Sequence, residues 1–295
     1  MGVIVRIIAS FFVAGILVGC IDRYPPRVVK IGLIAPFEGP SRPYGYAVLH
    51  AVNLRLQAWN TGGGQPQVEL VALNDDGDPE LAATLAAQLA LDPDVLIVLG
   101  PAQSHTARRA APALAAAGLP VLSLAPVPAA LWLWVEPLAG TTAELTTALA
   151  PWVPEATPAW DVPLTGPAIW LGDPLTLAEW RRTDPKQVPA AGPVAAEEAV
   201  QAWAGEAMAG LIWATVLPDD LPADFAVAYE ERTGISPPPI AMLAYAATDQ
   251  ALRLLAQART RSEVVAGFGR LPRWRYHVFI HQGHLCCTQS VSPPR

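Results

Sequence analysis

Hydrophobic and polar residues follow two different periods along residues 28–127. Short, continuous apolar runs predict buried strands at residues 28–34, 68–73, 95–99 and 121–124. Between these runs, apolar residues recur every three or four positions, which predicts helices at residues 45–60, 79–91 and 106–117. Strands that alternate with helices in this way are typical of a parallel, doubly wound α/β sheet.

The pattern weakens after residue 127. Thr141 and Glu144 have the spacing of a capping box at the start of a short helix. A proline-rich loop is expected at residues 151–167, and only residues 168–171 and 211–216 are convincing strands before residue 237. The remaining predicted elements are weak helices at 175–182 and 197–204, stronger helices at 221–233, 240–258 and 261–268, and a hairpin with strands at 276–280 and 285–287.

Composition and motifs narrow the functional classes. The 295 residues carry a formal net charge of −7, and Lys30 and Lys186 are the only lysines. No cluster of Lys and Arg is present to neutralise phosphates, so nucleic acid is not an expected partner. The sequence contains no GxGxxG after the first strand, no Walker loop, no GxSxG and no HExxH. We therefore expect a protein that is not an enzyme and needs no cofactor.

The N-terminus has the parts of a secretory signal. An apolar run at residues 7–19 follows Arg6 and ends in Leu17-Val18-Gly19-Cys20. This end resembles a bacterial lipobox, which implies cleavage before Cys20 and lipidation of its thiol. Residues 1–19 would then be a lipoprotein signal peptide and residues 20–27 a lipidated tether. The alternative is a transmembrane helix, but such a helix needs about 20 apolar residues.

Four local signatures then follow one another along the chain. They are Val29-Lys30-Ile31-Gly32-Leu33-Ile34-Ala35-Pro36 with Tyr44-Gly45, Val71-Ala72-Leu73-Asn74-Asp75-Asp76 with Asp78-Pro79, Gly100-Pro101-Ala102-Gln103-Ser104 with Leu119-Pro120-Val121-Leu122-Ser123, and Phe225 and Tyr229 with Tyr245-Ala246-Ala247-Thr248-Asp249. In this order they resemble the type I periplasmic solute-binding proteins, in particular the branched-chain amino-acid (Leu/Ile/Val) receptors of ABC transporters.

The resemblance implies an α/β fold with two lobes, each built on a parallel, doubly wound sheet. Lobe 1 would comprise residues 28–127 and 237–272, and lobe 2 residues 128–236 and 273–295. Receptors of this family usually carry several βα units in lobe 2. Because only two convincing strands are found there, we expect lobe 2 to be shortened.

The same resemblance implies a ligand site between the lobes. Ser104, after the Gly-Pro turn, would bind the solute through its hydroxyl, although a simple helix-cap role is the alternative. Ala125 would offer a backbone carbonyl, and Tyr44 would cover the ligand or lie in a surface turn. The next hydroxyl position falls on Val127, which has none, and this weakens the case for a standard amino acid. The acid that lobe 2 usually offers stays open among Asp173, Glu179 and Asp219.

Other conspicuous residues receive structural interpretations. We expect the tryptophans of the second lobe to fill its core more often than to line a cleft. Cys286 and Cys287 are interpreted as small apolar strand residues, with a strained vicinal disulfide as the alternative. No metal site is expected at the histidines near the C-terminus. The tryptophans and histidines concerned are Trp132, Trp134, Trp170, Trp180, Trp213, His277, His281 and His284.

The resulting functional hypothesis is an extracytoplasmic solute-binding protein held at the bacterial cell membrane by its lipid. It would close its lobes on a small polar solute, an amino acid or an amide, and deliver that solute to an ABC permease. The alternative is a degenerate family member that serves as a sensory or structural envelope lipoprotein, with a sensor protein as its partner and without solute transport.

Overall fold

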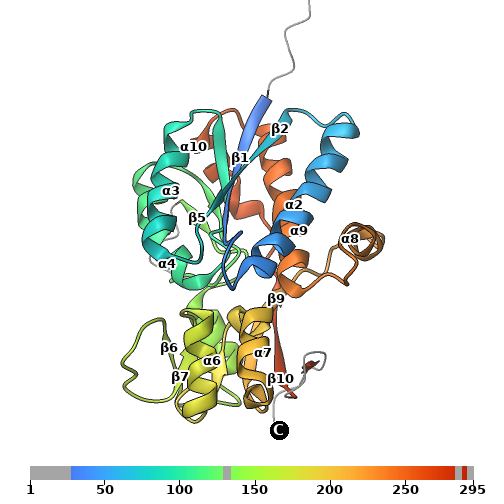
Figure 1. Cartoon of the computed structure of the whole chain (residues 1–295). Helices are drawn as coiled ribbons and strands as arrows, with labels where there is room; N and C mark the ends of the chain where they lie inside the picture. Colours follow the sequence, from blue (N-terminus) through green and yellow to red (C-terminus); the bar gives the residue numbers. More distant parts are fainter. Residues whose placement is uncertain (1–27, 129–133, 283–287, 291–295) are drawn as a thin grey trace, which may run out of the picture.

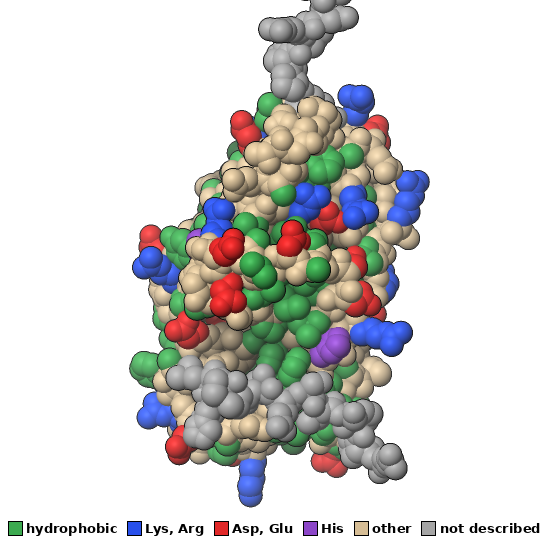
Figure 2. Space-filling view, turned by 90° about the vertical axis from the view of Figure 1, so that its right-hand side faces the viewer, with side chains coloured by type: hydrophobic (Ala, Val, Ile, Leu, Met, Phe, Trp, Pro, Cys, Tyr) green, Lys and Arg blue, Asp and Glu red, His purple; other side chains and the backbone are tan. Residues whose placement is uncertain are grey.

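The computed structural model describes residues 28–128, 134–282 and 288–290, and these residues form two lobes, one above the other (Figure 1). The predicted signal peptide, Cys20, Trp132, His284, Cys286 and Cys287 lie outside the described residues. No helix within the described part of the chain combines the length and the apolarity needed to cross a bilayer. On the face shown in Figure 2, acidic and basic side chains are interspersed over the upper lobe.

The first lobe contains a five-stranded parallel sheet with the order β2-β1-β3-β4-β5. Its strands are β1 (Val28–Ala35), β2 (Gln67–Asn74), β3 (Val95–Leu99), β4 (Val121–Leu122) and β5 (Val135–Glu136). The five residues of β3 are all buried, because helices cover both faces of the sheet. The sequence-based expectation of a parallel, doubly wound sheet is therefore confirmed.

The helices of the first lobe pack in two layers (Figure 1). One layer contains α3 (Pro79–Leu91) and α4 (Ser104–Ala116), and the other contains α2 (Arg42–Thr61), α8 (Phe225–Thr233), α9 (Pro239–Gln257), α10 (Arg261–Ala266) and η4 (Phe268–Arg270). Local sequence sets the helix starts. The Asp78 carboxylate, for example, accepts hydrogen bonds from the N–H groups of Glu80 and Leu81 at the start of α3.

The second lobe contains a six-stranded sheet with the order β11-β10-β9-β8-β7-β6. Its strands are β6 (Thr157–Ala159), β7 (Ala168–Trp170), β8 (Ala190–Ala191), β9 (Ile212–Leu217), β10 (Arg275–His281) and β11 (Thr288–Ser290). Strands β6 to β9 are parallel, whereas β10 and β11 run antiparallel to their neighbours. The sheet therefore has more strands than the sequence predicted, but the additional ones are two or three residues long.

Two helical layers cover this second sheet. On one face lie α6 (Pro174–Thr183), η2 (Pro193–Ala196), α7 (Glu198–Ala204) and η3 (Gly205–Met208), and on the other lies α5 (Thr142–Leu149). The capping box predicted at Thr141 and Glu144 is present before α5. Trp170 and Trp213 are buried in the core under α6 and α7, in the core role that was expected of them.

The main differences from the sequence-based expectations lie near the lobe boundaries. Strand β5 pairs with β4 in the first sheet, beyond the expected end of this part of lobe 1 at residue 127. Helix α8 was expected in lobe 2, but Phe225 and Tyr229 are buried in the first-lobe core, and the Phe225 ring lies 4.5 Å from that of Tyr245 in α9. The loop expected at residues 151–167 contains β6, and β8 was missed. Elements of two or three residues are too short to show a period.

Candidate functional site

A buried carboxylate connects the two lobes. Glu197, in the second lobe, is 1% exposed. Its Oε2 accepts a hydrogen bond from the Ser41 hydroxyl (2.8 Å), and its Oε1 accepts one from Nε2 of Gln103 (2.7 Å). The same Gln103 nitrogen lies 3.0 Å from the Ser41 hydroxyl oxygen. Because Ser41 and Gln103 belong to the first lobe, this three-residue contact marks the place where the lobes meet.

The chain places each of these residues just before a helix. Ser41 precedes α2 after strand β1, Gln103 precedes α4 after β3, and Glu197 precedes α7 after β8 and η2. The carboxyl ends of parallel strands are where open α/β sheets usually bind ligands. None of the three side chains caps its own helix. They are therefore free to hydrogen-bond across the lobe boundary.

The surroundings of Glu197 are acidic. Burial raises the pKa of Glu197 to about 7, and the charges of Asp173 and Asp75 raise it further, while the hydrogen bonds from Gln103 and Ser41 lower it. Asp75, at the end of β2, is fully buried, and burial raises its pKa to about 6. Both carboxylates are therefore held in an environment that favours their protonated forms.

Asp75 and His105 are linked through the backbone of Gly77. The Gly77 N–H donates to Oδ1 of Asp75 (3.0 Å), and Nε2 of His105 lies 3.0 Å from the Gly77 carbonyl oxygen. Burial lowers the pKa of His105, although the hydrogen bond to Gly77 and the Asp173 charge act in the opposite direction. Three buried atoms of this group have no hydrogen-bond partner among the described residues: Oδ2 of Asp75, Oε1 of Gln103 and Nδ1 of His105.

Two of the predicted ligand residues lie beside this group. Ser104 is buried as the first residue of α4, directly after Gln103, and is not the N-cap residue of that helix. Tyr44 is buried in the first turn of α2 and not in a surface turn. Burial raises the pKa of Tyr44 well above its usual value, and the nearby Glu197 charge contributes to the shift.

The third predicted residue has a different environment. Ala125 is buried in an apolar cluster together with Val127, which is fully buried. The carbonyl oxygen of Ala125 already accepts a hydrogen bond from the Ser123 hydroxyl (2.7 Å). The end of β4 thus offers a solute less polar surface than the resemblance implied.

Sequence reasoning did not identify Glu197. Of the acids considered for the second lobe, Glu179 and Asp219 are exposed, whereas Asp173 caps α6 through a 2.7 Å hydrogen bond from Thr176 N–H and acts electrostatically on Glu197. Glu197 and its exposed neighbour Glu198 both open an expected helix. No signal within the sequence separates these two adjacent acids, because only the packing of the lobes buries one of them.

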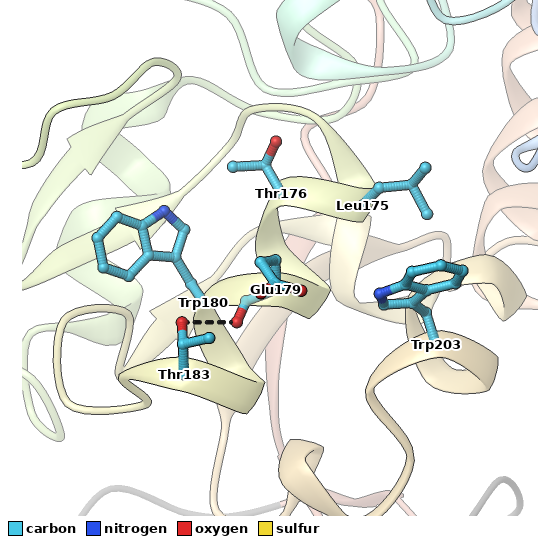
Figure 3. A pocket seen from close by; sticks show the side chains of 6 residues that line it. All are labelled: Leu175, Thr176, Glu179, Trp180, Thr183 and Trp203. Atoms are coloured by element: carbon cyan, nitrogen blue, oxygen red, sulfur yellow. Dashed lines mark hydrogen bonds between the residues drawn. The ribbon is translucent and has the colours of Figure 1, made fainter.

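The cavities of the described residues lie elsewhere. Ser41, Gln103 and Glu197 line none of the five main ones. One groove of about 470 Å³ runs between α6 and α7 (Figure 3), where Trp180 and Trp203 lie on either side of Glu179. The contact at the lobe boundary is therefore direct, with side chain against side chain.

Comparisons with known proteins agree with this architecture. Residues 28–158 match the periplasmic binding protein family. No curated protein matches the chain. Similar solved structures include the branched-chain amino-acid transporter substrate-binding protein LivJ from Streptococcus pneumoniae in complex with isoleucine (15% identity, 90% of this chain and 100% of that one, TM-score 0.70).

Two further structures have the same fold. The leucine-binding protein LivK from Thermotoga maritima is 17% identical over 90% of this chain and 98% of its own, with a TM-score of 0.72. A solute-binding protein of an ABC transporter from R. palustris, in complex with benzoate, is 15% identical over 90% and 96%, with a TM-score of 0.63. All three are binding proteins. The expected resemblance is confirmed: this chain has the type I periplasmic-binding-protein fold, and residues 28–158 carry the sequence pattern of that family.

Proposed function

We propose that the protein is an extracytoplasmic solute-binding protein that takes up a small polar solute between its lobes and delivers it to an ABC permease. The main support is the buried carboxylate of Glu197, which reaches from the second lobe to Ser41 and Gln103 of the first. Burying an acid costs free energy, and the hydrogen bonds from Ser41 and Gln103 compensate only in part, because burial still raises the pKa of Glu197 to about 7. A carboxylate in this position is therefore better explained by ligand binding than by stability.

Hinge closure would be the mechanism of capture. The chain passes between the two sheets after β5, after β9 and before β10, so the lobes are joined by short connections (Figure 1). In an open state, Glu197 would separate from Ser41 and Gln103, and all three would face water. A solute that donates hydrogen bonds to Glu197 and also contacts the first lobe would bind the closed state more tightly, and it would shift the population towards that state.

The anchor is part of the same proposal. Lipidation of Cys20 would hold the protein at the outer face of the bacterial cell membrane, where a permease could receive the solute. The lipobox-like sequence before Cys20 and the match to the periplasmic binding protein family support this location. A radiolabelled-palmitate experiment with Cys20→Ala as the control would test it, because only a lipidated cysteine incorporates the label and only its loss releases the protein from membranes.

A second function is favoured by two specific observations. Glu197 already has hydrogen bonds from Ser41 and Gln103, and Val127 is buried where the family resemblance implies a hydroxyl. A cleft that is satisfied by its own side chains would suit a sensory or structural envelope lipoprotein that captures no solute.

Thermal unfolding of the full chain in mild detergent, with and without candidate solutes, separates these functions. The panel comprises amino acids, amides, urea and small carboxylates. A solute at 100 times its Kd should add about 2.7 kcal/mol, which raises Tm by several degrees. The solute should stabilise Glu198→Gln as it does the wild type, and Glu197→Gln less. A panel without any shift would contradict solute capture and favour the second function.

A further inference from the structure

The unpartnered atoms beside Glu197 share one chemical property, which is that each accepts hydrogen bonds. Oδ2 of Asp75 is an acceptor when the carboxylate is ionised. Nε2 of Gln103 donates to a carboxylate oxygen of Glu197, so the other atom of this amide, Oε1, is the carbonyl oxygen. Nε2 of His105 faces a carbonyl oxygen and therefore carries the ring proton. Nδ1 of the neutral ring is then an acceptor.

These atoms belong to one connected group. The Gly77 backbone bonds both Asp75 and His105, and a Cβ atom added at Gly77 would lie 3.1 Å from Oε1 of Gln103. Gln103 in turn donates to Glu197. Asp75 is 0% and Gln103 3% exposed. A buried acceptor without a donor costs free energy, and such atoms often mark a functional site.

The main charges that act on this group are negative. The charges that act on Glu197 come from Asp173 and Asp75, and those that act on His105 from Asp173 and Asp161. Asp161 in turn pairs with Arg108 (3.3 Å), whereas the main charges that act on Glu197, Asp75 and His105 themselves come from acids. A ligand that brings positive charge and N–H groups would complement this group, whereas a ligand carboxylate would be repelled by it.

The end of β4 also provides few hydrogen-bond donors for a ligand carboxylate. Val127 has no hydroxyl and is fully buried, and the Ser123 hydroxyl donates to the Ala125 carbonyl. The N–H groups at the start of α4 and the hydroxyls of Ser104 and Tyr44 are donors in this neighbourhood, and the acids described above lie beside them.

We propose that the solute of this protein is a small organic cation rich in N–H groups and without a free carboxylate, such as an alkylamine or a guanidine. Its N–H groups would be bound by Glu197, Asp75, Gln103 and His105. The inference rests on the proposed function, since it requires that the lobes open and admit a solute. It departs from the amino-acid ligand that the family resemblance implies.

Matched pairs of probes test the inference directly. Binding of 3-methylbutylamine, leucinamide and agmatine to the full chain is measured by calorimetry and by the shift in Tm. Leucine and arginine are the carboxylate-bearing counterparts with the same side chains. We expect at least one of the three carboxylate-free probes to bind at least about tenfold more tightly than its counterpart, as loss of a repelled charge predicts.

The outcomes separate this inference from the proposed function. If leucine or arginine binds as tightly as its carboxylate-free counterpart, the inference is wrong and solute binding stands. If none of the five probes binds, the inference is contradicted, whereas the proposed solute capture is decided by the thermal-unfolding panel described above.

A pair of variants then locates the binding site. Asp75→Asn removes one buried charge and retains the shape of the side chain, and we expect it to weaken binding of the preferred cation about tenfold or more. Asp76→Asn is the matched control, because Asp76 is adjacent but exposed. Equal affinities of the two variants would place the cation elsewhere and overturn the assignment. Wild-type binding is measured independently, so a poorly folded Asp75→Asn does not affect the main test.

Discussion

The two lobes of this protein are built from the same kinds of element, but the elements differ in length. Strands β1 and β2 of the first lobe have eight residues each, and β3 has five. In the second lobe, the parallel strands β6, β7 and β8 have three, three and two residues, and only β9 and β10, with six and seven, are long. The first lobe also ends in two short strands, β4 and β5, with two residues each. Long strands align many backbone hydrogen bonds, whereas short strands depend on the side chains packed around them.

This difference in strand length accompanies a difference in how far each lobe keeps the sequence pattern of the family. The family match ends at residue 158, so it includes the first sheet and only the start of the second lobe. The second lobe is stabilised by large buried side chains such as Trp170 and Trp213. A tryptophan buries a large area at one position, which lets a small lobe maintain a core. The second lobe can therefore keep its shape while its sequence departs from the family pattern.

The largest expected effect is in the core of the second lobe. Trp170 is 1% exposed, and its indole N–H donates to the Asp173 carbonyl (2.9 Å). Trp170→Ala should lower the free energy of unfolding by about 4 kcal/mol, because it leaves a large cavity and an unpaired carbonyl. Hydrogen exchange should show lost protection in β7 and β9 and little change in β3. Equal losses of protection in both sheets would show that the two lobes do not unfold independently. Trp203→Ala, at an exposed position, is the control.

A complementary change targets the first lobe. A Cβ atom at Gly45, in the first turn of α2, would collide with the backbone carbonyl of Pro36 at the end of β1. Gly45→Ala should therefore cost about 3 kcal/mol, since neither backbone segment can move freely. Chemical denaturation measures the loss. Gly166→Ala should be nearly neutral, because an added Cβ at Gly166 meets no atom within 4 Å. Similar losses for both variants would show that the contact with Pro36 is unimportant.

The stability of the protein should depend on pH through the buried acids at the boundary between the lobes. Glu197 has a pKa of about 7 in the folded protein, above its ordinary value of 4.5, so the folded state binds its proton more tightly than the unfolded state does. Glu197 therefore lowers stability as pH rises from about 4.5 to 7, and Asp75 acts in the same direction at slightly lower pH. The charges of Asp173 and Asp75 favour the protonated form, and the hydrogen bonds from Gln103 and Ser41 oppose it.

Glu197→Gln should reduce this dependence. Between pH 5 and pH 8, the wild type should lose on the order of 2 kcal/mol relative to the variant, as the raised pKa of Glu197 requires. Urea denaturation across this range measures the difference. Glu198→Gln, with its exposed side chain, should follow the wild type. A parallel profile for Glu197→Gln would mean that Glu197 titrates normally and that the lobes do not bury its charge.

Much of the first lobe could be predicted from sequence, because its strands and helices are long enough to show a period. The same reasoning failed for β5, β6 and β8, which have too few residues for any pattern. The lobe assignment of α8 was missed for another reason. Its apolar residues Phe225 and Tyr229 predict a helix with a buried face, but they do not reveal which lobe covers that face.

At the candidate site, too, sequence reasoning did not predict which segments pack together. Ser104 and Tyr44 were recognised because they lie in family motifs of the first lobe, and both are near the buried group. Glu197 was missed because its burial depends on contact with Ser41 and Gln103, which are 156 and 94 residues away in the chain. The sequence can place an acid at a helix start, but it cannot show that another lobe covers it.

The smallest expected effect concerns the connections between the lobes. The hydroxyl of Tyr276, in β10, donates to the carbonyl oxygen of Ala139, which lies just after β5 on another connection (2.7 Å). Tyr276→Phe should lower the free energy of unfolding by only about 1 kcal/mol, the usual contribution of one hydrogen bond. Tyr46→Phe is the matched control, because no hydrogen bond of the Tyr46 hydroxyl is found within the described residues. If the bond also restrains the hinge, Tyr276→Phe should increase amide exchange at residues 137–141 more than its stability loss explains. Unchanged exchange there would show that the bond stabilises the second lobe without restraining the movement between the lobes.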